Sequence, residues 1–259
     1  MSRMIFKIRQ CLEVIRIIKN FPLYFANYFK LVNKKYIIYK LRNGIKYKTR
    51  SGTTDRGIIN EIFIYKEYNP RGFEIKKDDV VIDIGGHIGI FTILASKLAE
   101  NGKIYVFEPM PENFNLLLEN IRINNRSNVV AFKKAVASKN EKKDLFLSEG
   151  ENKGGNSFYK KNENSRKIEV ETLAFQDFIK KNKIKKIDFL KMDCEGGEYD
   201  ILFKCPKETL KKISKISMEY HNLSNKNNGE RLKAFLEKSG FIVIKKELRK
   251  RGMIYAKRE

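Results

Sequence analysis

The sequence predicts an α/β protein whose main sheet is parallel, with helices on both of its faces. From residue 79 onward, short apolar runs typical of buried strands alternate with runs of helical periodicity. A glycine-rich segment follows the first of these strands, and acidic residues stand at the ends of later ones. The 259 residues and 42% hydrophobic content are sufficient for one large domain with a buried core, and they exclude global disorder.

Residues 1–75 are predicted to form an extension with a helix and a β-hairpin. Apolar residues recur at helical spacing between residues 3 and 19, which predicts an amphipathic helix that ends before Pro22. The pair Asn43-Gly44 lies between two strand-like runs and predicts a hairpin turn. The main domain, residues 76–259, is expected to begin just before the first parallel strand.

The main domain carries the alternation of strands and helices. Strands are expected at residues 80–84, 103–107, 129–132, 187–192, 213–220, 241–244 and 253–256. Helices are expected at residues 90–98, 113–123, 173–181, 198–203 and 230–238. A polar, glycine-bearing insertion at residues 148–166 lies between two further strand-like runs, and we expect it to be a loop or hairpin.

The glycine-rich segment predicts a cofactor site. Asp83, Gly85, Gly86 and Gly89 lie directly between a predicted buried strand and a helix. Glycines there allow a ligand to approach the backbone, and the helix N-terminus offers free N–H groups. Glu108 ends the next strand, where an acidic side chain can bind ribose hydroxyls. Together these residues indicate a cofactor that contains adenosine.

The spacing of the glycines distinguishes between cofactors. A dinucleotide site uses Gly-x-Gly-x-x-Gly, which this segment lacks, and the chain has no phosphate-binding loop of the nucleotide triphosphatases. Asp83 would repel a pyrophosphate, but its negative charge suits a ligand with an ammonium group. S-adenosylmethionine is such a ligand.

Two further groups of polar residues follow later strands. Asp193 and Glu195 come directly after the strand expected at residues 187–192, and Glu219 and His221 end the next strand. Because ligands of open α/β sheets bind at the carboxyl ends of the strands, these side chains are expected to meet at one edge. Asp193, Glu195 and His221 are therefore the candidate catalytic residues.

These segments together resemble the FkbM family of S-adenosylmethionine-dependent methyltransferases. The resemblance covers about residues 40 to 259. It rests on residues 81–89, 106–109, 190–198 and 218–221, and upstream on Thr53-Thr54-Asp55, Glu61-Ile62-Phe63 and Glu67-Tyr68. It implies a class I methyltransferase sheet, Rossmann-like with an antiparallel last strand, and O-methyl transfer to a small molecule or glycan.

The resemblance also implies roles for the residues of the loops. It places Asp83 and residues 85–89 around the methionyl part of the cofactor, Glu108 on the ribose and Asp193 beside the donor methyl. Tyr68 would close over the amino-acid end of the cofactor. His87 stands where the family commonly has Asn or another small polar residue, so it would either add a charge switch or fill that space.

The residues leave several mechanisms open. A hydroxyl acceptor needs a base, and either His221 or Asp193 is expected to take the proton while Glu195 and Glu219 orient the acceptor. The same carboxylates and His221 could instead hold a divalent metal. An RNA or DNA methyltransferase is the alternative function, with Cys194 as a candidate nucleophile, although its carboxylate neighbours argue against that role. A scaffold without activity is a further alternative.

Composition limits the partners and the compartment. The 54 Lys and Arg against 31 Asp and Glu give a net charge of +23, which is explained either by a polyanionic partner or by a lysine-rich solvated surface. The predicted active edge is acidic, which argues against nucleic acid. The N-terminal helix is a candidate for peripheral contact with an anionic membrane. Three cysteines without a paired pattern, and no expected signal peptide or spanning segment, favour the cytoplasm.

Overall fold

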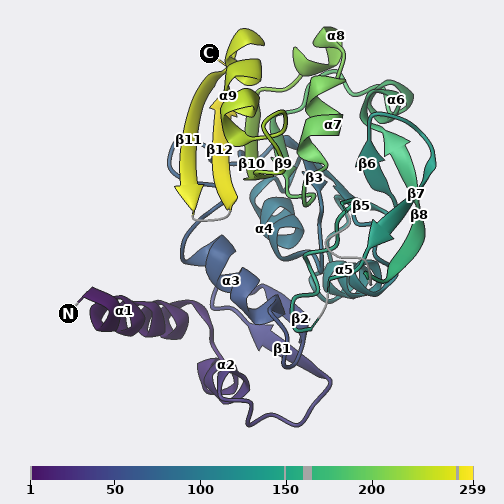
Figure 1. The fold of residues 1–259 in the computed structure, drawn as a ribbon. Helices are drawn as coiled ribbons and strands as arrows, with labels where there is room; N and C mark the ends of the chain where they lie inside the picture. The colour runs from purple at the N-terminus through teal and green to yellow at the C-terminus, as the bar shows by residue number, and fades with distance from the viewer. Residues whose placement is uncertain (1, 149, 160–164, 249–250, 259) are drawn as a thin grey trace.

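The structure of the protein, a computed structural model, describes the chain except residues 1, 149, 160–164, 249–250 and 259. In this part of the chain a seven-stranded sheet forms the centre of the molecule (Figure 1). In spatial order its strands are β11 (Ile242–Leu248), β12 (Arg251–Lys257), β10 (Lys215–His221), β9 (Phe189–Met192), β3 (Val80–Ile84), β4 (Lys103–Phe107) and β5 (Val129–Phe132).

The central sheet confirms the predicted fold class. The neighbouring pairs from β10 to β5 are parallel, whereas β12 runs antiparallel to both β10 and β11. The chain therefore inserts its last strand, in the opposite direction, between β10 and β11. This is the mostly parallel sheet with an antiparallel last strand that the family resemblance implies.

Helices cover both faces of the sheet because successive side chains of a strand point to opposite faces. On β3, Val81 faces the cluster that contains helix α4 (Ile90–Leu98), while Ile82 and Ile84 face the opposite cluster. Helix α5 (Pro111–Ile123) also joins the first cluster, through Leu116. The second cluster takes in α6 (Phe175–Lys181), α7 (Glu198–Phe203), α8 (Lys207–Leu210) and α9 (Gly229–Lys238).

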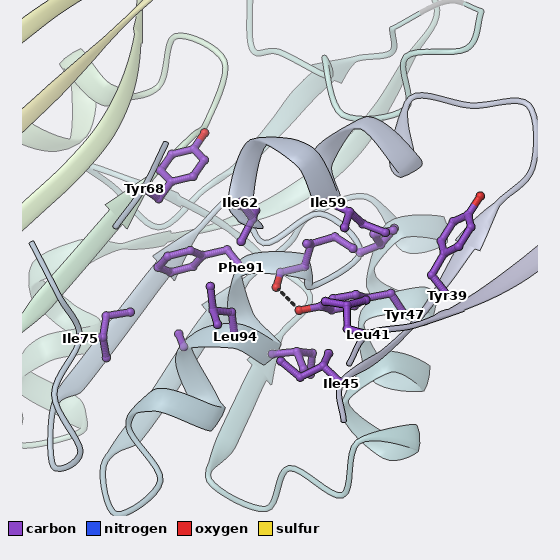
Figure 2. Packing of buried hydrophobic residues seen from close by; sticks show 14 of the residues in the cluster. Tyr39, Leu41, Ile45, Tyr47, Ile59, Ile62, Tyr68, Ile75, Phe91 and Leu94 are labelled. Carbon is purple, nitrogen blue, oxygen red and sulfur yellow. Dashed lines mark hydrogen bonds between the residues drawn. The ribbon is translucent and has the colours of Figure 1, made fainter. Parts of the chain in front are cut away.

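The N-terminal extension packs on the α4 face of the sheet. It comprises α1 (Ser2–Ile17), α2 (Phe21–Tyr28), the hairpin of β1 (Tyr36–Lys40) and β2 (Lys46–Arg50), and α3 (Asp55–Phe63). Tyr47 is fully buried and donates a hydrogen bond to the carbonyl of Ile90 at 2.8 Å. Figure 2 shows Ile59 and Ile62 of α3 in the same cluster as Tyr47 of β2 and Phe91 of α4, so the extension and the main sheet share one core. The sequence analysis did not predict α3.

A smaller sheet lies beside the main one. In the described part of the chain it has three strands, β6 (Ala135–Ala137), β8 (Lys167–Ala174) and β7 (Lys142–Phe146), in that order. Strands β7 and β8 are antiparallel and form a hairpin, and the insertion connects its two arms. A loop or a hairpin was the structure expected for this segment. The helix expected at residues 173–181 begins two residues later, because Leu173 and Ala174 pair with β6.

Candidate active site

The strand register brings the predicted loops to one row at the carboxyl edge of the sheet. Ile84 pairs with Phe107 of β4 and with Met192 of β9, and Met192 in turn pairs with Met218 of β10. The residues that follow these positions therefore lie side by side. They are Gly85, Glu108, Asp193 and Glu219.

A cavity of about 770 Å³ opens at this edge. Its wall is formed by the loops after β3, β4, β9 and β10, by helix α3 and the residues before it, and by residues 151–158 of the insertion. The lining includes eight of the ten predicted site residues: Tyr68, Gly85, Gly86, His87, Glu108, Asp193, Glu195 and His221. The other two, Asp83 and Gly89, do not line it.

Gly85 brings the loops after β3 and β9 into contact. Its φ of +79° is a left-handed conformation that favours glycine, and a Cβ at this position would lie 1.8 Å from the carbonyl oxygen of Asp193. The two loops therefore meet through main-chain atoms.

Asp83 lies beneath the loop rather than on the cavity wall. Its side chain is fully buried, accepts a hydrogen bond from Thr92 at 2.6 Å and lies 3.1 Å from the ammonium of Lys191. Lys191 also donates to the carbonyl of Gly85 at 2.6 Å. Lys191 neutralises Asp83 and holds the glycine loop, so Asp83 shapes the loop in this structure and has no face toward a ligand. Sequence reasoning missed Lys191.

His87 is a neutral residue in this structure. Burial lowers its pKa to about 4, against a smaller opposing effect from Asp55, whose carboxylate lies 3.6 Å away. Arg50, itself paired with Asp55 at 2.9 Å, contacts the Nε2 atom of the ring at 3.1 Å. At neutral pH the ring therefore fills space and accepts from Arg50. Of the two roles considered from the sequence, this geometry favours the filling role over the charge switch.

Glu108 is positioned to receive hydroxyl groups. The backbone N–H groups of His87 and Met110 donate to its two carboxylate oxygens at 2.8 and 2.9 Å. Burial nevertheless raises its pKa to about 7, since its side chain is 5% exposed. A ligand with hydroxyl donors would stabilise the charged form of this carboxylate.

Asp193 is held on the cavity wall by Tyr68. The Tyr68 hydroxyl donates to Oδ2 of Asp193 at 2.8 Å, and the ring packs against Phe91 of α4. Burial, followed by the negative charge of Asp193, raises the pKa of Tyr68 well above its usual value, so its proton stays on the hydroxyl. This hydrogen bond restrains the Asp193 carboxylate, and both residues line the cavity.

His221 lies among three carboxylates. Its Nε2 atom is 3.4 Å from Glu195 and 3.2 Å from Glu219, and its Nδ1 atom is 3.6 Å from Glu198. Burial by itself lowers the pKa of His221, but these carboxylates outweigh it and raise the pKa to about 11. The ring therefore carries two protons at neutral pH. A protonated histidine has no free nitrogen to accept a proton, so this geometry favours Asp193 over His221 among the two expected bases.

Arg251 and two glutamates complete the cluster, and sequence reasoning gave them no role. Arg251 stands opposite His221 in the β10–β12 register and pairs with Glu219. It also lies 3.8 Å from Glu61 of α3 and 3.6 Å from Glu67. Burial and the charge of Glu67 raise the pKa of Glu61 to about 7. Glu61 and Glu67 could have been identified from the sequence, because both stand in the upstream segment that carries the family resemblance.

The insertion closes one side of the cavity through specific contacts. The hydroxyl of Ser157 donates to the carbonyl of Glu195 at 2.6 Å, and Asn113 donates to the carbonyl of Lys153 at 3.1 Å. The backbone N–H of Thr54 donates to the carbonyl of Glu151 at 3.1 Å. The insertion thus contacts both the loop after β9 and the N-terminal extension.

The geometry bears on two of the alternatives. Burial, together with Glu198 and Asp193, raises the pKa of Cys194 well above its usual value, so its sulfur is a poor nucleophile. Among the residues that the structure describes, no group of three or more His, Cys, Asp and Glu is arranged to hold a metal ion. Neither a cysteine nucleophile nor a metal site is supported by these positions.

The cavity suits S-adenosylmethionine by the chemistry of its walls. Glu108 offers acceptors for a ribose, and the described wall carries six carboxylates, which suit a cationic ligand: Glu61, Glu108, Glu151, Asp193, Glu195 and Glu219. The close contact at Gly85 leaves the main chain of the loop at the cavity surface. These residues fit the cofactor that the sequence predicts.

Comparison with known proteins agrees with this geometry. Residues 83–243 match the model of the methyltransferase FkbM domain. "Methyltransferase 1" of Beauveria bassiana is 27% identical, and the match covers 72% of this chain and 80% of that protein. The "31-O-demethyl-FK506 methyltransferase FkbM" of Streptomyces tacrolimicus is 24% identical over 79% of this chain and 88% of its own length.

Two more distant similarities complete the comparison. The "Hexuronic acid methyltransferase AglP" of Haloferax volcanii is 24% identical over 57% of this chain and 58% of its own length. The structure of a Methanococcus jannaschii fibrillarin pre-rRNA processing protein has a TM-score of 0.52 at 15% identity, covers 88% of this chain and 85% of that one, and shares the fold. The chain belongs to the FkbM family of methyltransferases, and S-adenosylmethionine is its methyl donor.

Proposed function

We propose that the protein methylates a hydroxyl oxygen on a sugar, a glycan or a small metabolite. The observation that carries this proposal is the Asp193 carboxylate, which Tyr68 holds in the same cavity as the cluster of His221, Arg251 and their glutamates. The names of two relatives support the acceptor class, since one refers to O-demethyl-FK506 and the other to hexuronic acid.

The cofactor end of the cavity would be formed by the loops after β3 and β4. Gly85, Gly86 and His87 would face the cofactor, with Glu108 on its ribose and Tyr68 near its amino-acid end. Asp83 and Gly89 would act beneath them, by holding the loop and beginning α4. When bound, S-adenosylmethionine supplies the methyl group as a sulfonium.

Asp193 is our candidate for the base. The Asp193 carboxylate would take the proton that the acceptor hydroxyl loses as its oxygen receives the methyl group from S-adenosylmethionine, whose sulfur would leave as a thioether. Tyr68 keeps that carboxylate in place, and correct orientation of bound reactants contributes about 7 to 11 kcal/mol in such reactions. His221 is already protonated and would instead act as a cation that donates to the acceptor.

The acceptor end offers both kinds of hydrogen-bonding group. Glu195 and Glu219 would accept from the hydroxyls of the acceptor, while His221 and Arg251 would donate to its oxygens. Alternating donors and acceptors around a cavity suit a polyhydroxylated molecule.

The proposal is tested by methyl transfer from radiolabelled S-adenosylmethionine to fractionated sugars, glycans and metabolites. With the acceptor so found, Asp193→Asn should lower kcat by about 10² to 10⁴ while calorimetry shows retained cofactor binding. The control is Asp144→Asn, the same chemical change at a half-exposed side chain of β7 that does not line the cavity. If Asp193→Asn transfers methyl at the wild-type rate, Asp193 is not the base.

We also propose a reducing compartment, the cytoplasm, for the protein. Cys11, Cys194 and Cys205 are all free thiols in the structure. Among the described residues, no helix has the length and apolar character needed to cross a bilayer. Thiol titration of freshly isolated native protein should find all three cysteines reduced, and a disulfide would contradict this assignment.

A further inference from the structure

Helix α1 presents an apolar face to solvent. Ile5, Ile8, Leu12 and Ile15 are 52%, 54%, 60% and 36% exposed. Their spacing of three, four and three residues places them along one side of the helix. In the described part of the chain this face therefore remains open along most of α1.

The opposite side of α1 is attached to the protein, which fixes the direction of the open face. Val14 and Ile18 are buried in the core shared with the hairpin. Arg42 of the hairpin turn donates from its backbone N–H to the carbonyl of Ile17 at 2.9 Å. Figure 1 shows α1 at the edge of the molecule, with its N-terminal end pointing away from the other elements.

Basic residues border the apolar face. At 100° per residue, Arg9 and Arg16 lie along one edge of the face, whereas Lys7 lies on the side of Val14 and Ile18. The side chains of Arg9 and Arg16 are exposed. Between residues 2 and 35 the sequence has eight lysines or arginines and a single acidic residue, Glu13. Glu13 lies on the partly covered side of the helix.

We propose that α1 lies in the plane of an anionic lipid surface, with its apolar face among the acyl chains and its basic residues at the headgroups. Apolar residues flanked by Lys and Arg are typical of helices that bind membranes in this way. A second copy of the chain fits less well, because joining two such faces would bring their basic borders together on molecules that each carry a net charge of +23.

The test is sedimentation of the full chain with lipid vesicles, without cofactor or acceptor. Wild-type protein should bind vesicles of phosphatidylcholine with 30% phosphatidylglycerol, about tenfold or more tighter than pure phosphatidylcholine, and rising salt should weaken the binding. Ile8→Glu with Leu12→Glu should reduce binding about tenfold or more. The matched control is Ile242→Glu with Ile244→Glu, because these side chains are 48% and 50% exposed on β11.

Three outcomes would overturn the proposal. One is equal binding to anionic and neutral vesicles, and another is equal loss of binding in the Ile8/Leu12 variant and the β11 control. The third is a lipid-free dimer, seen by analytical ultracentrifugation, that the Ile8/Leu12 variant abolishes, since a second copy would then cover the face. Unchanged thermal unfolding and cofactor binding of the variants show that they are folded. The experiment reads lipid binding alone, so its result is separate from that of the proposed methyl transfer.

Discussion

At the scale of single residues, the two histidines of the chain have opposite electrostatic surroundings. His87 lies beside Arg50 in the glycine-rich loop that lines the cavity, whereas His221 lies among Glu195, Glu198 and Glu219. Burial acts against the charged form in both cases. Only the carboxylates around His221 are sufficient to reverse that effect.

This contrast predicts opposite pH dependences of stability for the two histidines. The pKa of His221 rises from 6.5 to about 11 on folding, so its stabilisation is complete below pH 6.5 and is lost as the pH rises toward 11. His221→Gln should lower the free energy of unfolding by about 3 kcal/mol at pH 6, and the difference should shrink by pH 9.5. Urea unfolding at the two pH values measures it.

His87→Gln is the comparison variant. The pKa of His87 falls from 6.5 to about 4, so the wild-type protein loses stability at this site as the pH falls from 6.5 toward 4. The difference between wild type and His87→Gln should therefore move in favour of the variant over that range. A parallel pH dependence for both variants would contradict the assigned charge states.

Gly85 gives a second prediction at this scale. Gly85→Ala should lower the free energy of unfolding by about 1 to 3 kcal/mol and weaken cofactor binding, because the new Cβ must displace the Asp193 carbonyl. Gly72→Ala is the matched control, since Gly72 has a similar φ of +87° with no atom within 4 Å of the added Cβ. Calorimetric titration with S-adenosylmethionine separates the two. If the two variants lose equal stability and equal cofactor affinity, backbone strain is responsible and the contact with the Asp193 carbonyl is not.

The roles of single residues were the hardest to predict from the sequence. The sequence analysis identified eight residues that line the cavity, since glycine spacing and strand ends are local signals. It could not predict that His221 is protonated, because the responsible carboxylates come from β10, from the loop after β9 and from α7. Arg251 was missed because its place opposite His221 follows from strand pairing.

At the scale of elements, a hydrogen bond joins the insertion to the loop after β9. Ser157 donates to the carbonyl of Glu195, a residue held at a φ of +50°. Glu195 in turn faces His221. The insertion can thereby influence the shape of the acceptor end of the cavity. Among the described hydrogen bonds, none joins Ser157 to Asp83 or Glu108.

Ser157→Ala should therefore raise KM for the acceptor about fivefold, as expected for the loss of one hydrogen bond, while Kd for S-adenosylmethionine stays near the wild-type value. Steady-state kinetics and calorimetry measure the two quantities. The control is Ser239→Ala, since Ser239 donates to the carbonyl of Phe235 at 2.8 Å after α9, away from the cavity wall. A change in cofactor affinity that matches the change in KM would show that Ser157 affects the cofactor end of the cavity as much as the acceptor end.

Strong local patterns predicted the elements of the main sheet, and weaker ones were missed. All seven predicted strands of the main domain occur in the described structure, because each contains a short apolar run, and β3, β4, β9 and β10 are buried along most of their length. Helix α3 was missed because its nine residues include Gly57 and several polar side chains, and its burial depends on contact with α4. The start of α6 shifted because β6, a three-residue strand, pairs with Leu173 and Ala174.

At the scale of the whole molecule, positive charge and chemistry are separated. The net charge is +23, yet the described cavity wall carries six carboxylates. A nucleic-acid substrate would have to bring phosphates to this acidic wall. Part of this separation was predicted from the sequence, because Glu108, Asp193, Glu195 and Glu219 stand at the ends of strands, which share one edge of a parallel sheet.

Binding to nucleic acid, the alternative function, should therefore be weak and without consequence for catalysis. In a titration with a short RNA duplex, we expect binding at low salt to disappear by about 0.2 M salt, with no transfer of labelled methyl to the RNA. Polyglutamate, an unrelated polyanion, should compete equally well. Tight binding that survives physiological salt, together with label on the RNA, would replace our proposal with a nucleic-acid methyltransferase.

The main-chain contact between Gly85 and Asp193 has a consequence for how new substrates arise. Backbone atoms at the ends of two paired strands set the distance between Gly85 and Asp193, so that distance does not depend on the side chains around them. Under the proposed function, substitutions in the insertion and in α3 would alter which molecule is accepted while this distance is kept. Selectivity for the acceptor can then change in this architecture while the methyl-transfer reaction stays the same.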